Sequence, residues 1–442
     1  MIIRVNLSKR RKIILAGGFC SLVGISLIKE LFTKNIKARN ISEMPEEYAM
    51  LTNLAVRRTS LKKESLVIRN ANFDENFDKY IACENTIFLN CNFQTGGGLK
   101  IKSLTNVKFE NCDFNDANIS GGVWTDVQFV DCSAQGKFLI LADEGSKNVL
   151  FQRCSFYGPH AIFGTSHEND FGGVGSLGTS QFNDCTLKYV HIMGETSLTI
   201  KDSHLRKVDS SASRKNAVVV LDNVEILEYL DLQQGIFAQL TIRNCKFEFM
   251  NLEGIKCNNV LVEGCAGHLV GKFMELKEMA IRDSVFKAGG DRRNPFDNQM
   301  AALSTSGSDI GNLTLDGLKF EGVNGTLYIG GSENLLYDKD NPKYEKFEIS
   351  KFKKISIHRV PLNGSFFGYI KTDELDIVDS SIENTNFGNS AFGRIKFLDV
   401  KLAGKIDFSK SAVENFFEKN TITAPTLSLE RDEKKMINFR SI

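Results

Sequence analysis

The chain has 442 residues, with 55 Lys and Arg against 54 Asp and Glu, and its formal net charge is +1. This balance argues against a nucleic-acid binder with a broad basic face and against an acidic mimic of DNA. A hydrophobic content of 42% excludes wholesale disorder. The 33 Phe beside 36 Gly and only 6 Pro indicate short strands joined by turns.

Residues 1–35 have the features of a signal anchor. Arg4 and the basic cluster 9–12 precede an uncharged run over residues 13–28. As a helix this run spans about 24 Å, against ~30 Å for the hydrocarbon core, and no small-residue cleavage site follows closely. We therefore predict an uncleaved membrane anchor, with a cleaved signal peptide and a buried helix as alternatives. The positive-inside rule then puts the rest of the chain on the periplasmic or extracytoplasmic side.

Residues 36–65 are predicted to form a linker and a short capping helix over residues 42–59. Ser42 can cap its N-terminus, Pro45 suits a first turn, and Glu46 and Glu47 lie at the positive end of the helix dipole. Such a helix would cover the open end of a repeat array.

From Leu66 onward one four-residue phrase recurs, in which Cys follows a polar residue and precedes another polar residue and Phe. It occurs as Asn90-Cys91-Asn92-Phe93, Asn111-Cys112-Asp113-Phe114, Arg153-Cys154-Ser155-Phe156 and Asn244-Cys245-Lys246-Phe247. The phrase returns about every 20 residues, with weaker copies between. A period of this length predicts a solenoid.

Over residues 107–134 the pattern subdivides by five. Phe114, Ile119, Trp124 and Phe129 keep that spacing, with a small or apolar residue two positions before each. This resembles the pentapeptide-repeat family, whose four-unit coils form a right-handed quadrilateral β-helix. The resemblance implies an all-β fold, with one right-handed parallel β-helix over residues 66–408 and a C-terminal cap or tail over 409–442. Because the clean register covers only residues 107–134, a three-faced β-helix like that of pectate lyases stays an alternative.

Seven of the 10 cysteines occupy an inward position of this repeat, where Cys packs as a small hydrophobe. They are Cys91, Cys112, Cys132, Cys154, Cys185, Cys245 and Cys265. We interpret them as reduced interior residues. Their spacing of about 20 matches no zinc motif, and we expect no metal site.

Three segments break the period, namely residues 158–180, 289–311 and 328–344. Insertions in solenoids become surface loops, often on the binding side. The first contains His167, Glu168 and Asp170, a candidate loop for ligand binding whose polar residues are more simply explained as solvated. The chain has no P-loop, no His-Glu-x-x-His and no Gly-x-Ser-x-Gly motif, so we expect no nucleotide and no other cofactor.

The repeat register predicts one outward stripe of polar side chains. Successive coils place His160, His191, Asp209, Asp231 and Asn251 at the same outward position, with Asp209 and Asp231 one rung apart. Two carboxyls ~5–5.5 Å apart suit a retaining glycosidase, and Arg206 would then be a further binding residue. Asn and Asp at this position are, however, ordinary turn residues of the repeat, and that structural interpretation is preferred.

These features favour a membrane-anchored β-helix of the bacterial cell envelope that acts as a non-enzymatic binding or scaffold protein. Its partner would be a polymer, such as a polysaccharide, or a protein. The alternative is a carbohydrate-active enzyme, a polysaccharide lyase or glycoside hydrolase of the right-handed β-helix type. That alternative rests on the fold, which does not by itself imply function.

Overall fold

The structure is a computed structural model in which most of the repeat region is described. The described residues are 2–7, 11–16, 65–73, 80–93, 99–115, 117–134, 137–141, 145–157, 160–162, 178–193, 197–212, 217–287, 301–321, 326–333, 347–424, 428–431 and 439–441. The chain forms two compact units, Met1–Leu205 and Arg206–Ile442. In the described residues both units consist of strands and turns.

The strands of the first unit are β1 (Ile2–Leu7), β2 (Arg11–Ala16), β3 (Leu66–Arg69), β4 (Asn72–Phe73), β5 (Tyr80–Leu89), β6 (Asn92–Phe93), β7 (Leu99–Glu110), β8 (Asn118–Ser120), β9 (Val123–Val130), β10 (Ser133–Ala134), β11 (Lys137–Leu141), β12 (Lys147–Gln152), β13 (Ser155–Phe156), β14 (His160–Ile162), β15 (Thr179–Asn183) and β16 (Thr186–Met193). The boundary between the units lies within β17 (Ser197–Ala212).

The strands of the second unit are β18 (Ala217–Asp231), β19 (Ile236–Arg243), β20 (Lys246–Asn251), β21 (Lys256–Glu263), β22 (Ala266–Val270), β23 (Glu275–Arg282), β24 (Val285–Lys287), β25 (Ala301–Ser304), β26 (Asp309–Asp316), β27 (Lys319–Glu321), β28 (Thr326–Tyr328), β29 (Ser332–Glu333), β30 (Phe347–Glu348), β31 (Ser350–His358), β32 (Pro361–Asn363), β33 (Ile370–Val378), β34 (Ser381–Glu383), β35 (Ala391–Leu398), β36 (Lys401–Ala403), β37 (Lys405–Phe408), β38 (Ala412–Lys419), β39 (Ile422–Thr423), β40 (Ser428–Arg431) and β41 (Phe439–Ser441).

The N-terminal predictions fall largely outside the described residues. Strands β1 and β2 pair antiparallel, and β2 takes up the first residues of the uncharged run 13–28. The rest of that run and the predicted helix 42–59 are not described. In the part of the chain that the structure describes, no helix is long and apolar enough to cross a bilayer.

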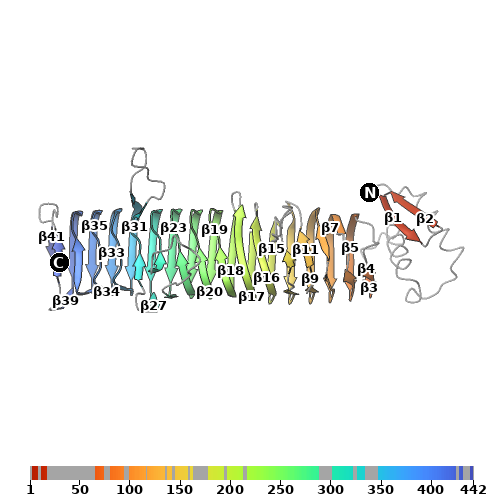
Figure 1. Ribbon diagram of the computed structural model, residues 1–442, viewed down its shortest axis with the longest axis horizontal. Coiled ribbons are helices and arrows are strands. Elements are labelled where there is room, and N and C mark those ends of the chain that lie inside the picture. The colour runs from red at the N-terminus through yellow and green to blue at the C-terminus, as the bar shows by residue number, and fades with distance from the viewer. Residues whose placement is uncertain are drawn as a thin grey trace. The chain divides into compact units, whose positions relative to one another are not determined.

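Each unit is a parallel β-solenoid, as predicted. In the first unit, strand β7 pairs in parallel with β5 and β9, and β12 pairs with β9 and β15. In the second, β21 pairs with β19 and β23, and β33 pairs with β31 and β35. Figure 1 shows these strands following one another side by side within each unit. Every coil therefore adds one rung at ~4.8 Å.

Two columns of Phe rings fill the core of the first unit. Register pairing aligns Phe88, Phe109, Phe129, Phe151 and Phe182, whose successive ring centroids are 4.9, 4.7, 4.6 and 4.4 Å apart. A second column contains Phe73, Phe93 and Phe114, stacked at 4.5 and 5.0 Å. Rings of the two columns meet edge to face, the arrangement that aromatic quadrupoles favour.

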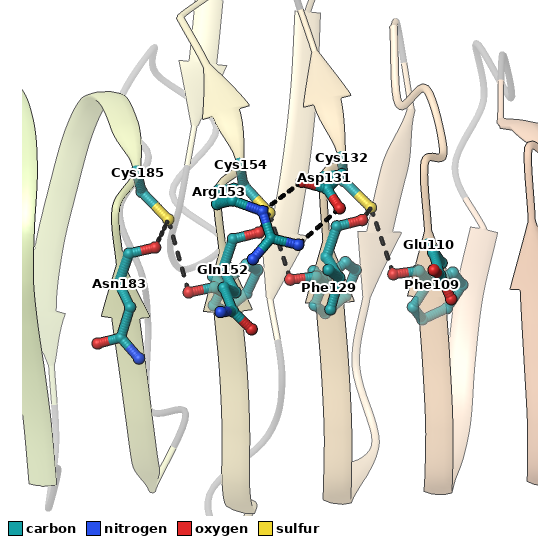
Figure 2. A network of polar contacts seen from close by, with 12 residues as sticks. Phe109, Glu110, Phe129, Asp131, Cys132, Gln152, Arg153, Cys154, Asn183 and Cys185 are labelled. Atoms are coloured by element: carbon teal, nitrogen blue, oxygen red, sulfur yellow. Dashed lines mark hydrogen bonds and ion pairs between the residues drawn. The ribbon is translucent and has the colours of Figure 1, made fainter.

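The inward small position of each coil follows a corner. The residue before Cys112 is Asn111 and the one before Cys132 is Asp131, and both have φ near +50°, a region in which Asn and Asp are enriched. The thiol of Cys132 lies 3.4 Å from the carbonyl oxygen of Val130 and 3.5 Å from that of Phe109. Figure 2 shows Cys132 beside Phe109 of the preceding coil. A thiol here satisfies carbonyl groups at the end of a rung, and the seven predicted inward cysteines are buried.

A clean five-residue register also runs through the C-terminal coils. From the sequence alone this register was clear only over residues 107–134. The paired inward residues, all buried, are Val360 and Leu362, Ser365 and Phe367, Ile370 and Thr372, Leu375 and Ile377, Ser380 and Ile382, Thr385 and Phe387, Ser390 and Phe392, Ile395 and Phe397, and Val400 and Leu402. Asp379, Asn384 and Asn389 mark successive corners with positive φ, and Asp399 repeats the first. These coils are thus four-sided.

The ladder also differs from the predicted boundaries. The segment 289–311 was predicted to break the period, yet β25 lies within it and β26 begins in it, and these strands pair in parallel with β22 and β23. Past residue 408, β38 pairs in parallel with β35 and with β41. The break therefore ends before Ala301, and parallel pairing continues into the segment expected to form the cap or tail.

Candidate functional site

Three residues of the predicted stripe have described side chains. Asp209 lies on β17, and Asp231 on β18 is the register partner of Asn251 on β20. Asp209 Oδ2 is 3.1 Å from the ammonium group of Lys207, which lies 5.1 Å from the ring centroid of Tyr229. His160 and His191 lie on β14 and β16, and their side chains are outside the described residues, as are His167, Glu168 and Asp170.

The Asp231 carboxylate is engaged in a turn. Its Oδ1 accepts a hydrogen bond from the Gln233 amide at 3.4 Å, and its Oδ2 accepts one from the Gln233 side chain at 3.3 Å. Asn251 accepts the same bond from the amide of Glu253 at 3.0 Å. The side chains of Asp113, Asn386 and Asp407 also each accept a hydrogen bond from the backbone amide two residues later in the chain. Asx turns of this kind explain Asp and Asn here without catalysis.

Burial raises the pKa of Asp231, the hydrogen bond from the Gln233 amide opposes that rise, and the neighbouring Asp209 charge adds to it. Asp231 is half-buried although it lies on the outward stripe, and this burial is the main cause of the shift. Arg206, the further candidate, pairs with Glu228, its Nε lying 2.7 Å from Oε1.

The second unit carries a shallow groove of about 680 Å³ on the outer face of β18, β19, β21, β23, β26 and β31. Its floor is one register row of side chains that are short or carry no charge, namely Val220, Thr241, Leu261, Ala280, Thr314 and Ser356. Two rows of longer side chains flank this row, and the difference in length makes the groove. Six rungs at ~4.8 Å give it a length of about 24 Å.

The groove walls are polar. One wall is the register row Gln239, Asn259, Glu278, Asn312 and Lys354, and the other includes Arg243 and Arg282. Gln239 Nε2 donates to Thr241 Oγ1 at 3.0 Å, which ties wall to floor. Amide side chains can both donate to and accept from a hydroxyl-rich ligand.

An ion cluster marks the end of the floor on the C-terminal side. There the floor row continues with Asp376, the register partner of Ser356. Lys354 Nζ lies 3.1 Å from Asp376 and 3.4 Å from Glu374, and Arg394 Nη2 lies 2.9 Å from Glu374 Oε2. Long charged side chains replace the short ones at this point, so the groove stops.

No family model matches the chain, and no curated protein matches it. Two solved structures of trypsin-treated variants of QnrB1, a plasmid-mediated fluoroquinolone resistance protein, are similar to it. One is 15% identical over 57% of this chain and 91% of that chain, with a TM-score of 0.14. The other is 9% identical over 78% and 90%, with a TM-score of 0.12. The fold assignment rests instead on the five-residue register and its corners.

The chain is a pentapeptide-repeat-like β-helix. Within the described residues of this β-helix, no group of three or more His, Cys, Asp and Glu side chains is arranged to hold a metal ion. The groove, rather than a cluster of titratable residues, is the feature of its surface that stands out.

Sequence reasoning missed the groove because its rows join residues at unequal separations. Ala280 is the register partner of Thr314, and Thr314 is the register partner of Ser356, although long segments separate these strands in the chain. The sequence signal that could have found it is a long polar residue followed two positions later by a short one, as in Asn312-Leu313-Thr314 and Lys354-Ile355-Ser356, once the strands were in register.

Replacing Asp231 by Asn is expected to raise stability at neutral pH. A carboxyl whose pKa is raised on folding destabilises the native state fully above its folded pKa, and this penalty fades as the pH falls from the folded pKa towards the unfolded one. Asn keeps the turn bond, as Asn251 shows. Thermal unfolding of both proteins at pH 7 and pH 4 measures the effect, which should shrink at the lower pH. A lower melting temperature for Asp231→Asn at pH 7 would contradict this account.

Proposed function

We propose that this protein is a non-catalytic binding scaffold that recognises a polymer or a protein partner along the outer surface of its β-helix. The groove over β18 to β31 carries the proposal, because its walls repeat hydrogen-bonding side chains on successive rungs. Strands paired on both sides hold these side chains without further ordering on binding, which lowers the entropic cost of association.

Hydrolysis or elimination on a polysaccharide is the second candidate function. The raised pKa of Asp231 beside the charged Asp209 is the observation that favours it, since a general acid needs such a shift. The turn bonds to Asp231 and the ion pair of Asp209 with Lys207 support the scaffold instead, because they use both carboxylates structurally.

Binding is expected without turnover. The full chain would be incubated with a panel of bacterial polysaccharides and with protein extracts from bacterial envelopes, and bound material would be separated from released products. Reducing-end and unsaturated-uronate assays should detect no product. Product release by the native protein that disappears in the Asp209→Asn, Asp231→Asn double variant would assign the enzyme function, and failure to retain any polymer or protein would reject the scaffold.

The N-terminal segment is proposed to anchor this scaffold in a bacterial membrane, with the β-helix on the periplasmic or extracytoplasmic side. The support is the basic cluster 9–12 before the uncharged run 13–28. The native protein should sediment with membranes and keep its N-terminus, while a chain beginning at Ser42 should stay in the supernatant. Mature protein that begins after Lys29 would show a cleaved signal peptide instead.

A further inference from the structure

The groove carries an excess of positive charge. The charged residues that line it are Arg243, Arg282 and Lys354, against the single carboxylate of Glu278. Two of the three cations already have partners, since Arg243 Nε lies 3.1 Å from Glu263 and Lys354 bridges Glu374 and Asp376. Exposed Arg282 forms no ion pair with any described residue.

The neighbours of Arg282 explain why it is unpaired. Its register partners are Glu263 on β21 and Asp316 on β26. Glu263 forms an ion pair with Arg243. Asp316 Oδ1 lies 2.7 Å from Arg359 Nη2 and 3.0 Å from His358 Nδ1. Both carboxylates beside Arg282 are therefore neutralised by other cations, which leaves its guanidinium available to an anion from outside the chain.

Strand β23 presents complementary groups across the groove. Glu278 stands on one wall, Ala280 on the floor and Arg282 on the opposite wall. A carboxylate accepts hydrogen bonds from hydroxyl groups, a guanidinium binds a carboxylate bidentately, and the small Ala280 leaves room between them for a ring. A sugar unit with hydroxyls on one edge and a carboxylate on the other fits this arrangement.

The floor also favours a polysaccharide over an extended peptide. Peptides that bind sheets usually add a strand at a free edge and use its backbone groups. Here β19, β21, β23 and β26 are each paired on both sides, so the groove offers side chains and no unpaired edge.

We propose that the groove binds an acidic polysaccharide laid along the solenoid axis, with Arg282 holding a carboxylate of one sugar unit and Glu278 the hydroxyls of the same unit. This rests on the proposed scaffold function and names its ligand class. Amides at Gln239, Asn259 and Asn312 bind hydroxyls of neighbouring units on the same wall.

Calorimetric titration of the full-length protein tests the proposal, with oligogalacturonate as the acidic probe, dextran oligosaccharides as the neutral probe and poly-glutamate as the acidic peptide. Oligogalacturonate should bind, with an affinity that falls as salt rises. Arg282→Gln should weaken it about tenfold or more, since a charge-assisted contact is lost. Ala280→Ile, which fills the floor without changing charge, should weaken it similarly.

Lys277→Gln is the matched control. Lys277 is exposed on the same strand and outside the groove, so its loss removes an equal charge and should change the affinity by less than about twofold. Circular dichroism of all three variants should match the native protein, which separates lost binding from lost folding.

Equal losses in Lys277→Gln and Arg282→Gln would overturn the proposal, because binding would then follow net charge alone. Equal or tighter binding of dextran or poly-glutamate would also overturn it, while leaving the scaffold function standing. Absence of oligogalacturonate binding would overturn the ligand class and leave the scaffold function standing, provided that the protein retains another polymer or protein from the binding panel described above. If nothing is retained there, the scaffold function itself fails.

Discussion

Replacing Phe114 by Ala is expected to lower the free energy of unfolding by about 3–5 kcal/mol. The ring is fully buried and stacks on Phe93 with centroids 5.0 Å apart. It also meets Phe109 edge to face at 5.6 Å. Truncation removes its apolar surface from the core and leaves a cavity between two rungs that are fixed by backbone pairing and cannot close on it.

Chemical denaturation of the full chain, followed by circular dichroism, measures this loss. Val123→Ala is the control in the same coil, because its side chain is 44% exposed and its loss should cost less than about 1 kcal/mol. A loss below about 1 kcal/mol for Phe114→Ala would mean that the ring does not face the core and that the register is misassigned.

Replacing Ser390 by Val is expected to cost about 2 kcal/mol or more. The buried hydroxyl lies 3.0 Å from the carbonyl oxygen of Phe367 and accepts a hydrogen bond from the Ile370 amide, also at 3.0 Å. Val makes neither bond, and its larger side chain also crowds this buried position. The buried Ile370 N–H and the buried Phe367 carbonyl, both in the preceding coil, then lose a partner, which is the expensive half of removing a hydrogen bond.

Ser390→Cys is the matched control, since the chain itself uses Cys at this position. The thiol of Cys112 contacts the carbonyl oxygens of Phe88 and Glu110 at 3.5 and 3.4 Å. We expect Cys to retain more than half of the stability that Val loses, measured by the same denaturation. Equal losses for Val and Cys would show that the polar contacts at this corner contribute nothing.

Both substitutions probe the inward pair of a five-residue side, and the sequence predicted only part of that pattern. The phrase around Cys112 and Phe114 is conspicuous because one small and one aromatic residue recur together. In the C-terminal coils Ser, Thr, Ile, Leu and Val share the first position of each inward pair, so the spacing is kept while the residue type varies. The pairs Ser390 and Phe392, and Ile395 and Phe397, are equivalent only when their burial is known.

Of the candidate stripe, too, the sequence predicted one part and only the structure shows the other. That Asp231 and Asn251 would lie at equivalent positions followed from the sequence, and the register confirms it. That the Asp231 side chain bonds the Gln233 amide, and that its pKa is raised by burial, depends on how the neighbouring coils cover it. Neither follows from residue spacing.

The sequence by itself determined that this chain is a β-solenoid with cysteines and Phe residues inside, because a local period of about 20 residues with fixed inward positions leaves little other way to bury them. Only the tertiary structure decided that the C-terminal coils have four sides and that Ala280, Thr314 and Ser356 form one groove floor. Loops of unequal length separate these strands in the chain. Backbone pairing between coils, rather than sequence distance, sets which outward side chains become neighbours.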